Sequence, residues 1–181
     1  MPYDRKTWKE ALIASYNTIE ELSGVFLVSQ GKERRPNIMT IGWLQGGIIW
    51  GRPILTILVR PSRYTFVHIE ENPHFTVCIP TEKMKKEIQW CGTQSGIVVD
   101  KFQKTSFTSD YRENFSVPVI QECPIAFECE VVQKTRVIET NFSQKILNEY
   151  YPTGDFHTVY YGEILRVKFP MGLSWEKEGN N

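Results

Sequence analysis

The sequence has few residues that would support catalysis by protein side chains alone. It contains no Gly-x-Gly-x-x-Gly after a strand, no phosphate loop of the Gly-x-x-x-x-Gly-Lys-Ser/Thr type, no His-Glu-x-x-His and no Gly-x-Ser-x-Gly elbow. Only three histidines, His68, His74 and His157, occur among the 181 residues. These absences argue against hydrolysis by protein groups and against metal catalysis. We expect His68 and His74 to be packed or on the surface, and only His157 stays open as a functional residue.

Net charge, long apolar runs and cysteine clusters are also missing. Lysine plus arginine total 21 and aspartate plus glutamate total 21, so the overall field attracts neither nucleic acid nor an anionic membrane. No leader-like segment and no apolar run of membrane-spanning length occurs. We therefore expect a cytoplasmic protein without a nucleic acid or membrane partner. The four cysteines lack metal-site spacing and predict buried thiols, with Cys91 beside a candidate site.

What the sequence does contain is enough apolar residues for one domain. Hydrophobic residues make up 41% of the chain, and no Pro/Gly/Ser-rich linker divides it. We expect a single domain over residues 1–181, with its core at about residues 20–170. Short runs rich in branched and aromatic residues, bounded by Gly, Pro or Asn, predict strands. These strands are 25–29, 38–43, 54–59, 75–79, 125–137 and 158–169.

Helical segments lie between the predicted strands. An amphipathic N-terminal helix with Leu12, Ile13 and Tyr16 is expected to cover one end of the fold. Further helices are predicted from Tyr64 to Glu71, over 82–90 and within 139–156. Because the strands read as antiparallel and the helices as peripheral, the pattern predicts a mainly β fold, a closed or split β-barrel with peripheral helices.

The segment Arg60-Pro61-Ser62-Arg63-Tyr64-Thr65 is the strongest candidate for a binding site. It follows a strand and opens a helix, where guanidinium groups, hydroxyls and free first-turn N–H groups can hold phosphate oxygens. Such residues are also ordinary caps and surface residues. A second segment with Cys91-Gly92, Ser95-Gly96 and Lys101 adds further donors and close backbone approach. Together they predict a phosphorylated ligand, as expected of a redox protein whose cofactor carries the chemistry.

These segments, in their order along the chain, resemble the flavoredoxin-type flavin reductases. The resemblance runs from about Gly24 to Val167. Its motifs are Asn37-Ile38-Met39-Thr40, Arg60 to Thr65, Phe75 to Pro80, Cys91-Gly92 with Ser95-Gly96, Asp100-Lys101-Phe102, Glu122-Cys123-Pro124 with Glu128-Cys129, and His157 with Gly162-Glu163.

The resemblance implies an FMN-binding split barrel, a six-stranded antiparallel Greek-key barrel, and a homodimer with non-covalent FMN near the interface. Residues implied to hold the FMN phosphate are Arg60, Ser62, Arg63 and Thr65 with Ser95 and Lys101. Residues implied to lie along the ring or ribityl chain are Asn37, Met39 and Thr40, with backbone groups near Thr56 and Ile57. The implied site also contains Tyr64, Cys91, Gly92 and Gly96, with His157 approaching from the partner subunit or the dimer edge.

Some of these residues have a structural interpretation as well. Met39 on a strand is typical of a core residue, Asn37 of a turn end, and Asp100 of a helix cap. Two features depart from the family pattern. The segment Glu139 to Phe156 is longer than expected, and Gly46-Gly47 is an unusual turn.

The resemblance implies an NAD(P)H-dependent flavin reductase that transfers hydride from nicotinamide to bound FMN and on to free flavin or an acceptor protein. An alternative is a non-enzymatic FMN-binding electron carrier reduced by a partner protein. A third is an enzyme like the pyridoxamine phosphate oxidases, whose substrate motifs are not evident. Since nicotinamide stacking needs only an open ring face, the sequence does not distinguish NADH from NADPH.

Overall fold

The computed structural model describes residues 7–170. Its helical elements are α1 (Thr7–Leu22), α2 (Tyr64–Glu71), η1 (Glu82–Met84), α3 (Lys85–Thr93), α4 (Lys101–Thr105), η2 (Glu139–Asn141) and α5 (Gln144–Tyr150). Its strands are β1 (Val25–Ser29), β2 (Asn37–Ile41), β3 (Leu44–Ile49), β4 (Arg52–Val59), β5 (His74–Ile79), β6 (Ser109–Asp110), β7 (Val119–Ile120), β8 (Ile125–Arg136) and β9 (Thr158–Lys168).

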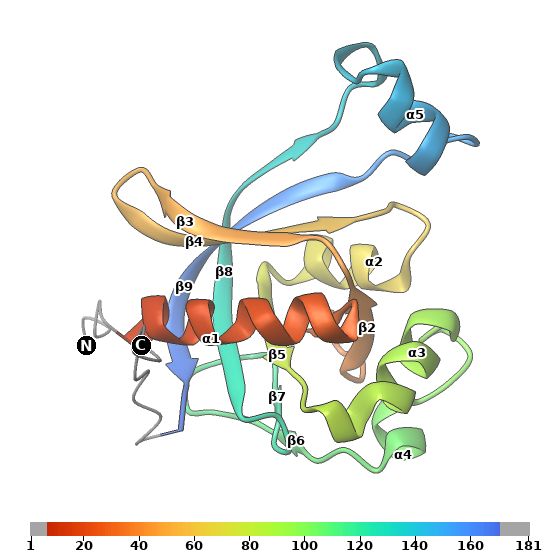
Figure 1. Ribbon diagram of the computed structural model, residues 1–181. Helices are drawn as coiled ribbons and strands as arrows, with labels where there is room; N and C mark the ends of the chain where they lie inside the picture. The colour runs from red at the N-terminus through yellow and green to blue at the C-terminus, as the bar shows by residue number, and fades with distance from the viewer. Residues whose placement is uncertain (1–6, 171–181) are drawn as a thin grey trace, which may run out of the picture.

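The main sheet has seven strands, in the order β2-β1-β5-β8-β9-β4-β3, and every neighbouring pair is antiparallel. The two edge strands, β2 and β3, are joined by only two residues, Gly42 and Trp43. Such a short connection between opposite edges requires the sheet to curl. The curled sheet confirms the split barrel expected from the sequence (Figure 1).

Six strands were expected, and the seventh is β3. Gly46 and Gly47, predicted to form a turn, instead lie within β3 and pair with Leu55 and Ile54 of β4. The glycine at position 46 has a packing reason. A Cβ atom there would lie 2.5 Å from Cδ2 of Leu12, whereas one on Gly47 would meet nothing within 4 Å. Gly46 therefore gives α1 room to pack on β3.

Helix α1 lies across the barrel and buries one stripe of its surface (Figure 1). Trp8, Ala11 and Leu12 belong to the core beneath it, together with residues of β1, β4, β5, β8 and β9. Of the three apolar positions predicted to define the helix, only Leu12 faces this core. Ile13 and Tyr16 remain 52% and 43% exposed.

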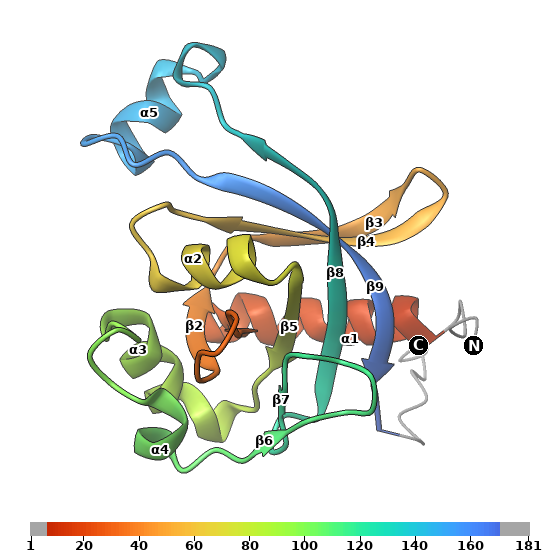
Figure 2. The ribbon, with the colours of Figure 1, turned by 180° about the vertical axis from the view of Figure 1, so that it is seen from behind.

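The end of β8 and the segment that leads from it to β9 project from the barrel as an extension, which we call the arm (residues 132–157) and which carries α5 at its tip (Figure 2). Strand β9 itself stays in the sheet, since its residues 158–163 pair with β4. The first five residues of β8 are buried, but most of the strand beyond them is exposed. Helix α5 has no buried residue. Near its base the arm is attached to α2, where Glu70 accepts hydrogen bonds from Lys134 Nζ at 2.5 Å and from the Tyr160 hydroxyl at 2.8 Å.

Other sequence predictions can be compared with the fold. The segment after Phe102 is mostly irregular, as expected, apart from the short β6–β7 pair. All four cysteines are buried free thiols, as predicted. Burial raises the pKa of the Cys91 thiol to about 11, which makes it unreactive. No helix within residues 7–170 is long and apolar enough to span a bilayer.

Candidate functional site

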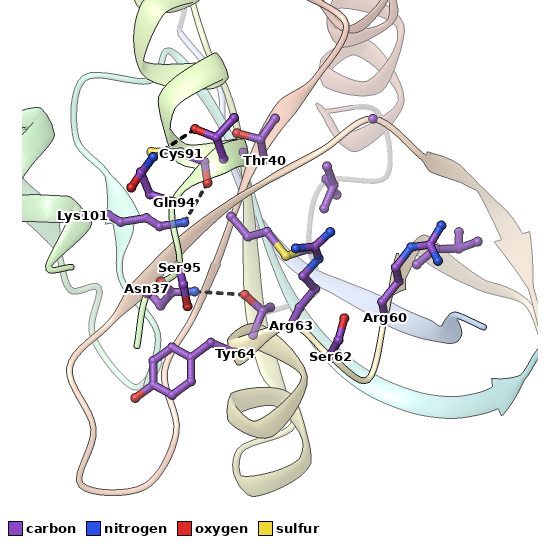
Figure 3. Close-up of a pocket in the computed structure, with 18 of the residues that line it drawn as sticks. Asn37, Thr40, Arg60, Ser62, Arg63, Tyr64, Cys91, Gln94, Ser95 and Lys101 are labelled. Carbon is purple, nitrogen blue, oxygen red and sulfur yellow. Dashed lines mark hydrogen bonds between the residues drawn. The ribbon is translucent and has the colours of Figure 1, made fainter. Parts of the chain in front are cut away.

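A pocket of about 330 Å³ lies where the N-terminus of α2, strand β2, the end of α3 and the start of α4 meet (Figure 3). This volume is within the range of small-molecule sites. Fourteen of the sixteen predicted site residues line it. They are Asn37, Met39, Thr40, Arg60, Ser62, Arg63, Tyr64, Thr65, Cys91, Gly92, Ser95, Gly96, Lys101 and His157.

The first wall of the pocket is the turn from β4 into α2. The helix begins at Tyr64, as predicted, and its N-cap residue, Arg63, makes no side-chain capping bond. Beside the turn, Asn37 Nδ2 donates to Thr65 Oγ1 at 3.0 Å, which fixes β2 against the first turn of α2. Donor groups at an uncapped helix N-terminus favour an anion.

The opposite wall is formed by the end of α3 and the loop that follows it. Cys91 and Gly92 lie in the last turn of α3, which ends at Thr93 and not at residue 90 as predicted, and only Ser95 and Gly96 are in the loop. Arg35 Nη2 donates to the Gly96 carbonyl at 3.1 Å. A Cβ atom on Gly96 would lie 1.9 Å from Oδ1 of Asn37, so only glycine allows the loop to approach β2 this closely.

Lys101 enters the pocket from α4 and is 2% exposed. Its Nζ donates to the Cys91 carbonyl at 2.7 Å, and it forms no ion pair with a carboxylate among residues 7–170. Burial lowers the pKa of Lys101, and the nearby charge of Arg63 lowers it further. Asp100 is a helix cap, the structural alternative for this residue, because its Oδ1 accepts from the Gln103 backbone N–H at 3.1 Å.

Arg63 enters from the α2 side (Figure 3). Its guanidinium group makes no hydrogen bond or ion pair with any part of the chain that the structure describes. The pocket therefore contains two cationic side chains, Arg63 and Lys101, without a matching carboxylate. Lys101 is buried, and a buried cation is costly unless a counter-charge reaches it. The Arg63 guanidinium is exposed and keeps all its donors available, so the two side chains together fit a phosphate group.

Arg60 lines the pocket as predicted, but its guanidinium group already has partners within the chain. Its Nη2 donates to the Tyr150 carbonyl at 2.7 Å, and its Nη1 donates to the carbonyls of Asp155 and Gly154 at 3.0 and 3.3 Å. The guanidinium group also lies 5.0 Å from the centre of the Tyr151 ring. Arg60 lines the pocket but holds the tip of the arm, because backbone carbonyls satisfy the donors that we had assigned to phosphate.

Ser62 is likewise engaged by the arm. Its hydroxyl donates to Asp155 Oδ2 at 2.6 Å, and its backbone N–H donates to Oδ1 at 3.4 Å. A carboxylate of the chain itself, rather than a free site, therefore faces the Ser62 donors.

Thr56 and Ile57 are not brought to the pocket. Thr56 is 3% exposed and Ile57 is fully buried. Both lie in the middle of β4, where their backbone groups are in register with β3 on one side and β9 on the other. Because ladder hydrogen bonds engage these backbone groups, they are not available to a ligand, and neither residue lines the pocket.

His157 lines the pocket of its own chain, just before β9 begins. Its Nδ1 is 2.8 Å from the Tyr151 hydroxyl, and its ring centre is 5.0 Å from that of Trp43. Burial lowers the pKa of His157 to about 4, and the charge of Arg60 contributes to this shift. The imidazole is therefore neutral at pH 7.

The two remaining strand residues of the predicted set have a structural contact as well. The Thr40 hydroxyl donates to the Ile88 carbonyl at 2.6 Å and so fixes β2 to α3. Met39 packs against the core, its structural interpretation, and also lines the pocket.

The sequence prediction did not include six residues that line the pocket, namely Ile41, Gly42, Trp43, Leu58, Thr93 and Gln94. Three of them could have been found from their position on the chain. The strand that supplied Asn37, Met39 and Thr40 leads directly to Ile41, Gly42 and Trp43.

Comparison with known proteins agrees with this fold and pocket. The family model described as "Flavin reductase like domain" matches residues 21–176. Flavoredoxin from Methanosarcina acetivorans is 28% identical, with a TM-score of 0.65 over 82% of this chain and 68% of that chain.

Two further structures have lower sequence identity to this chain and share the fold alone. An FMN-binding protein from Thermus thermophilus with bound p-hydroxybenzaldehyde is 21% identical, with a TM-score of 0.64 over 83% of this chain and 73% of that one. A protein of Shewanella frigidimarina that is described as a flavin reductase with a split barrel domain is 14% identical, with a TM-score of 0.68 over 95% of this chain and 81% of that one. The chain belongs to the flavin reductase-like family, whose match covers nearly all of the curled sheet and the pocket beside it.

Proposed function

We propose that the pocket binds FMN non-covalently and that the protein is an NAD(P)H-dependent flavin reductase. The observation that carries this proposal is the pair of cations, Arg63 and Lys101, that face the pocket without a carboxylate partner within residues 7–170. Bound FMN would accept a hydride from NADH or NADPH and pass electrons to free flavin or to an acceptor protein.

The residues of the chain would bind and orient the cofactor. Arg63 and Lys101 supply charge-assisted hydrogen bonds to the phosphate, and the uncapped first turn of α2 adds backbone N–H donors. Neutral His157 and Trp43 line another part of the pocket, where an aromatic and uncharged surface suits a planar ring.

Anaerobic reduction tests the enzymatic part of this proposal. The purified protein is reconstituted with FMN and titrated with NADH and NADPH while the flavin absorbance is followed. We expect at least one nicotinamide to bleach the bound flavin. If neither does so, and dithionite does, the protein is not a nicotinamide-dependent reductase.

The second candidate is an electron carrier that takes its electrons from a partner protein. The similarity to a flavoredoxin supports it, as does the absence of a catalytic acid, base or nucleophile from the predicted set. The same titration distinguishes the two, because a carrier keeps its FMN yet is reduced only slowly by either nicotinamide.

We also propose that the protein is a homodimer. The arm supports this proposal, because α5 buries no residue within its own chain and Val132 and Ile138 of the arm are 42% and 58% exposed. A seven-residue helix without a fully buried residue is a marginal structure unless it packs against another surface. A second subunit would supply that packing.

A further inference from the structure

The turn before α2 already has an anion in contact with it, the carboxylate of Asp155. Both oxygens of this carboxylate are engaged by Ser62, at 2.6 Å by the hydroxyl and at 3.4 Å by the backbone N–H. These are the donors that an incoming phosphate would need at the same turn. The side chain of Asp155 therefore lies where the sequence predicted a ligand oxygen.

The arm holds this carboxylate in place through its backbone. Gly154 and Asp155 both have left-handed φ angles, 78° and 55°, which form the turn that directs Asp155 towards Ser62. Arg60 Nη1 donates to the carbonyls of both residues. Asp155 itself is exposed, so its carboxylate can move into water without a burial penalty.

A phosphate and the Asp155 carboxylate cannot both use the Ser62 hydroxyl, because a hydroxyl group donates a single hydrogen bond. They would also repel each other, since a phosphate monoester carries close to two negative charges at pH 7. Arg63 and Lys101 have no carboxylate partner within the described residues, and their positive charges favour the phosphate on the pocket side of the turn. The two anions are therefore competitors.

We propose that the Asp155 carboxylate is an internal anion that occupies the Ser62 donors and is displaced from them by the phosphate of the ligand. Asp155 is thus a residue that limits affinity, and ligand binding loosens the contact between the arm and the α2 turn. This inference rests on the proposed function for the identity of the ligand, but the exchange of anions can be tested with inorganic phosphate as well.

The test is a double-mutant cycle with Asp155→Asn and Ser62→Ala. Asparagine keeps the shape of Asp155 and tolerates its left-handed φ angle. Affinities for FMN and for inorganic phosphate are measured by calorimetry for the wild type, both single variants and the double variant. Glu139→Gln is the matched control, because it removes one exposed carboxylate from the same arm that does not hydrogen-bond to Ser62.

We expect Asp155→Asn to bind both anions at least about fivefold more tightly, the effect of removing one nearby like charge. Glu139→Gln should stay within about twofold of the wild type. In the Asp155→Asn background, Ser62→Ala should weaken binding by about fivefold or more, because the hydroxyl then has only a neutral amide oxygen as its alternative acceptor and donates more strongly to the charged phosphate.

Two results would overturn the inference. One is an Asp155→Asn variant that folds, as judged by circular dichroism, and binds phosphate no more tightly than the wild type. The other is a Ser62→Ala substitution without effect in the Asp155→Asn background, which would mean that the phosphate never reaches Ser62. A wild type that binds inorganic phosphate with this pattern but does not bind FMN would contradict the proposed function alone.

Discussion

At the scale of single residues, Arg63 and Arg60 differ in what their guanidinium groups contact. Arg63 is free of partners within the described part of the chain, whereas Arg60 holds three carbonyls of the arm. We expect Arg63→Ala to weaken FMN binding by about 2 kcal/mol, the loss of one charge-assisted contact, without lowering the thermal stability of the cofactor-free protein.

The matched variant for Arg63→Ala is Arg60→Ala. Arg60→Ala should lower the affinity for FMN less than Arg63→Ala does. It should also accelerate amide hydrogen exchange over residues 150–157, because the carbonyls at the arm tip lose the hydrogen bonds that Arg60 donates. Calorimetry and hydrogen exchange by mass spectrometry check both effects. Equal losses of FMN affinity in the two variants, with no change in exchange, would contradict the assignment.

His157 links stability to pH. Its native pKa is about 4 against an ordinary value of 6.5, so only the unfolded chain takes up this proton between pH 6.5 and pH 4. The free energy of unfolding should therefore fall as the pH is lowered through this window, by up to about 1.4 kcal/mol per pH unit. Urea unfolding of the wild type and of His157→Gln at pH 7, 5.5 and 4.5 measures it. An identical pH dependence in the two proteins would show that His157 titrates normally.

The sequence predicted most of the residues that line the pocket, but it did not predict which groups contact Arg60 and Ser62. A strand, a turn with two arginines and a helix start follow one another in the chain, so local pattern is enough to place Arg63 beside the first turn of α2. The partners of Arg60 and Ser62 lie 90 to 95 residues away, in an arm of unusual length. Because a carboxylate and backbone carbonyls accept the same hydrogen bonds as phosphate oxygens would, the residue types alone could not separate the two roles.

At the scale of secondary-structure elements, the packing of α1 on β3 depends on a single glycine. Two glycines lower the strand propensity of residues 44–49, and for this reason the sequence did not predict β3. We expect Gly46→Ala to destabilise the protein by about 1–3 kcal/mol, because the new methyl group would overlap Leu12.

Gly47→Ala is the control for this change, because Gly47 is the next residue of β3 and has open space at its Cβ position. Its unfolding free energy should differ from that of the wild type by less than about 0.5 kcal/mol. Urea denaturation of both variants gives the comparison. If the two alanines have the same effect, strand propensity rather than contact with α1 determines the cost.

At the scale of the whole molecule, the exposed arm leads to a prediction about association. The barrel buries its own core, but the arm carries α5 away from the barrel (Figure 2). The apolar side chain of Ile138 on the arm is also exposed. If a second copy of the chain covers this arm, sedimentation equilibrium of the protein with FMN should give twice the mass of one chain. A stable monomer with bound FMN would contradict the dimer.

A charge placed on the arm locates the interface. Ile138→Asp would bury a carboxylate in the contact between subunits and should weaken association by several kcal/mol, so that sedimentation at micromolar concentration shows monomer. Thr140→Asp adds the same charge at an exposed polar position two residues away and should leave the dimer intact if only the apolar face of the arm is covered. Because Ile138 is already exposed in the single chain, its substitution should not unfold the barrel, and circular dichroism checks this. A dimer that tolerates Ile138→Asp would place the interface on another surface and leave the arm to pack against α2 alone.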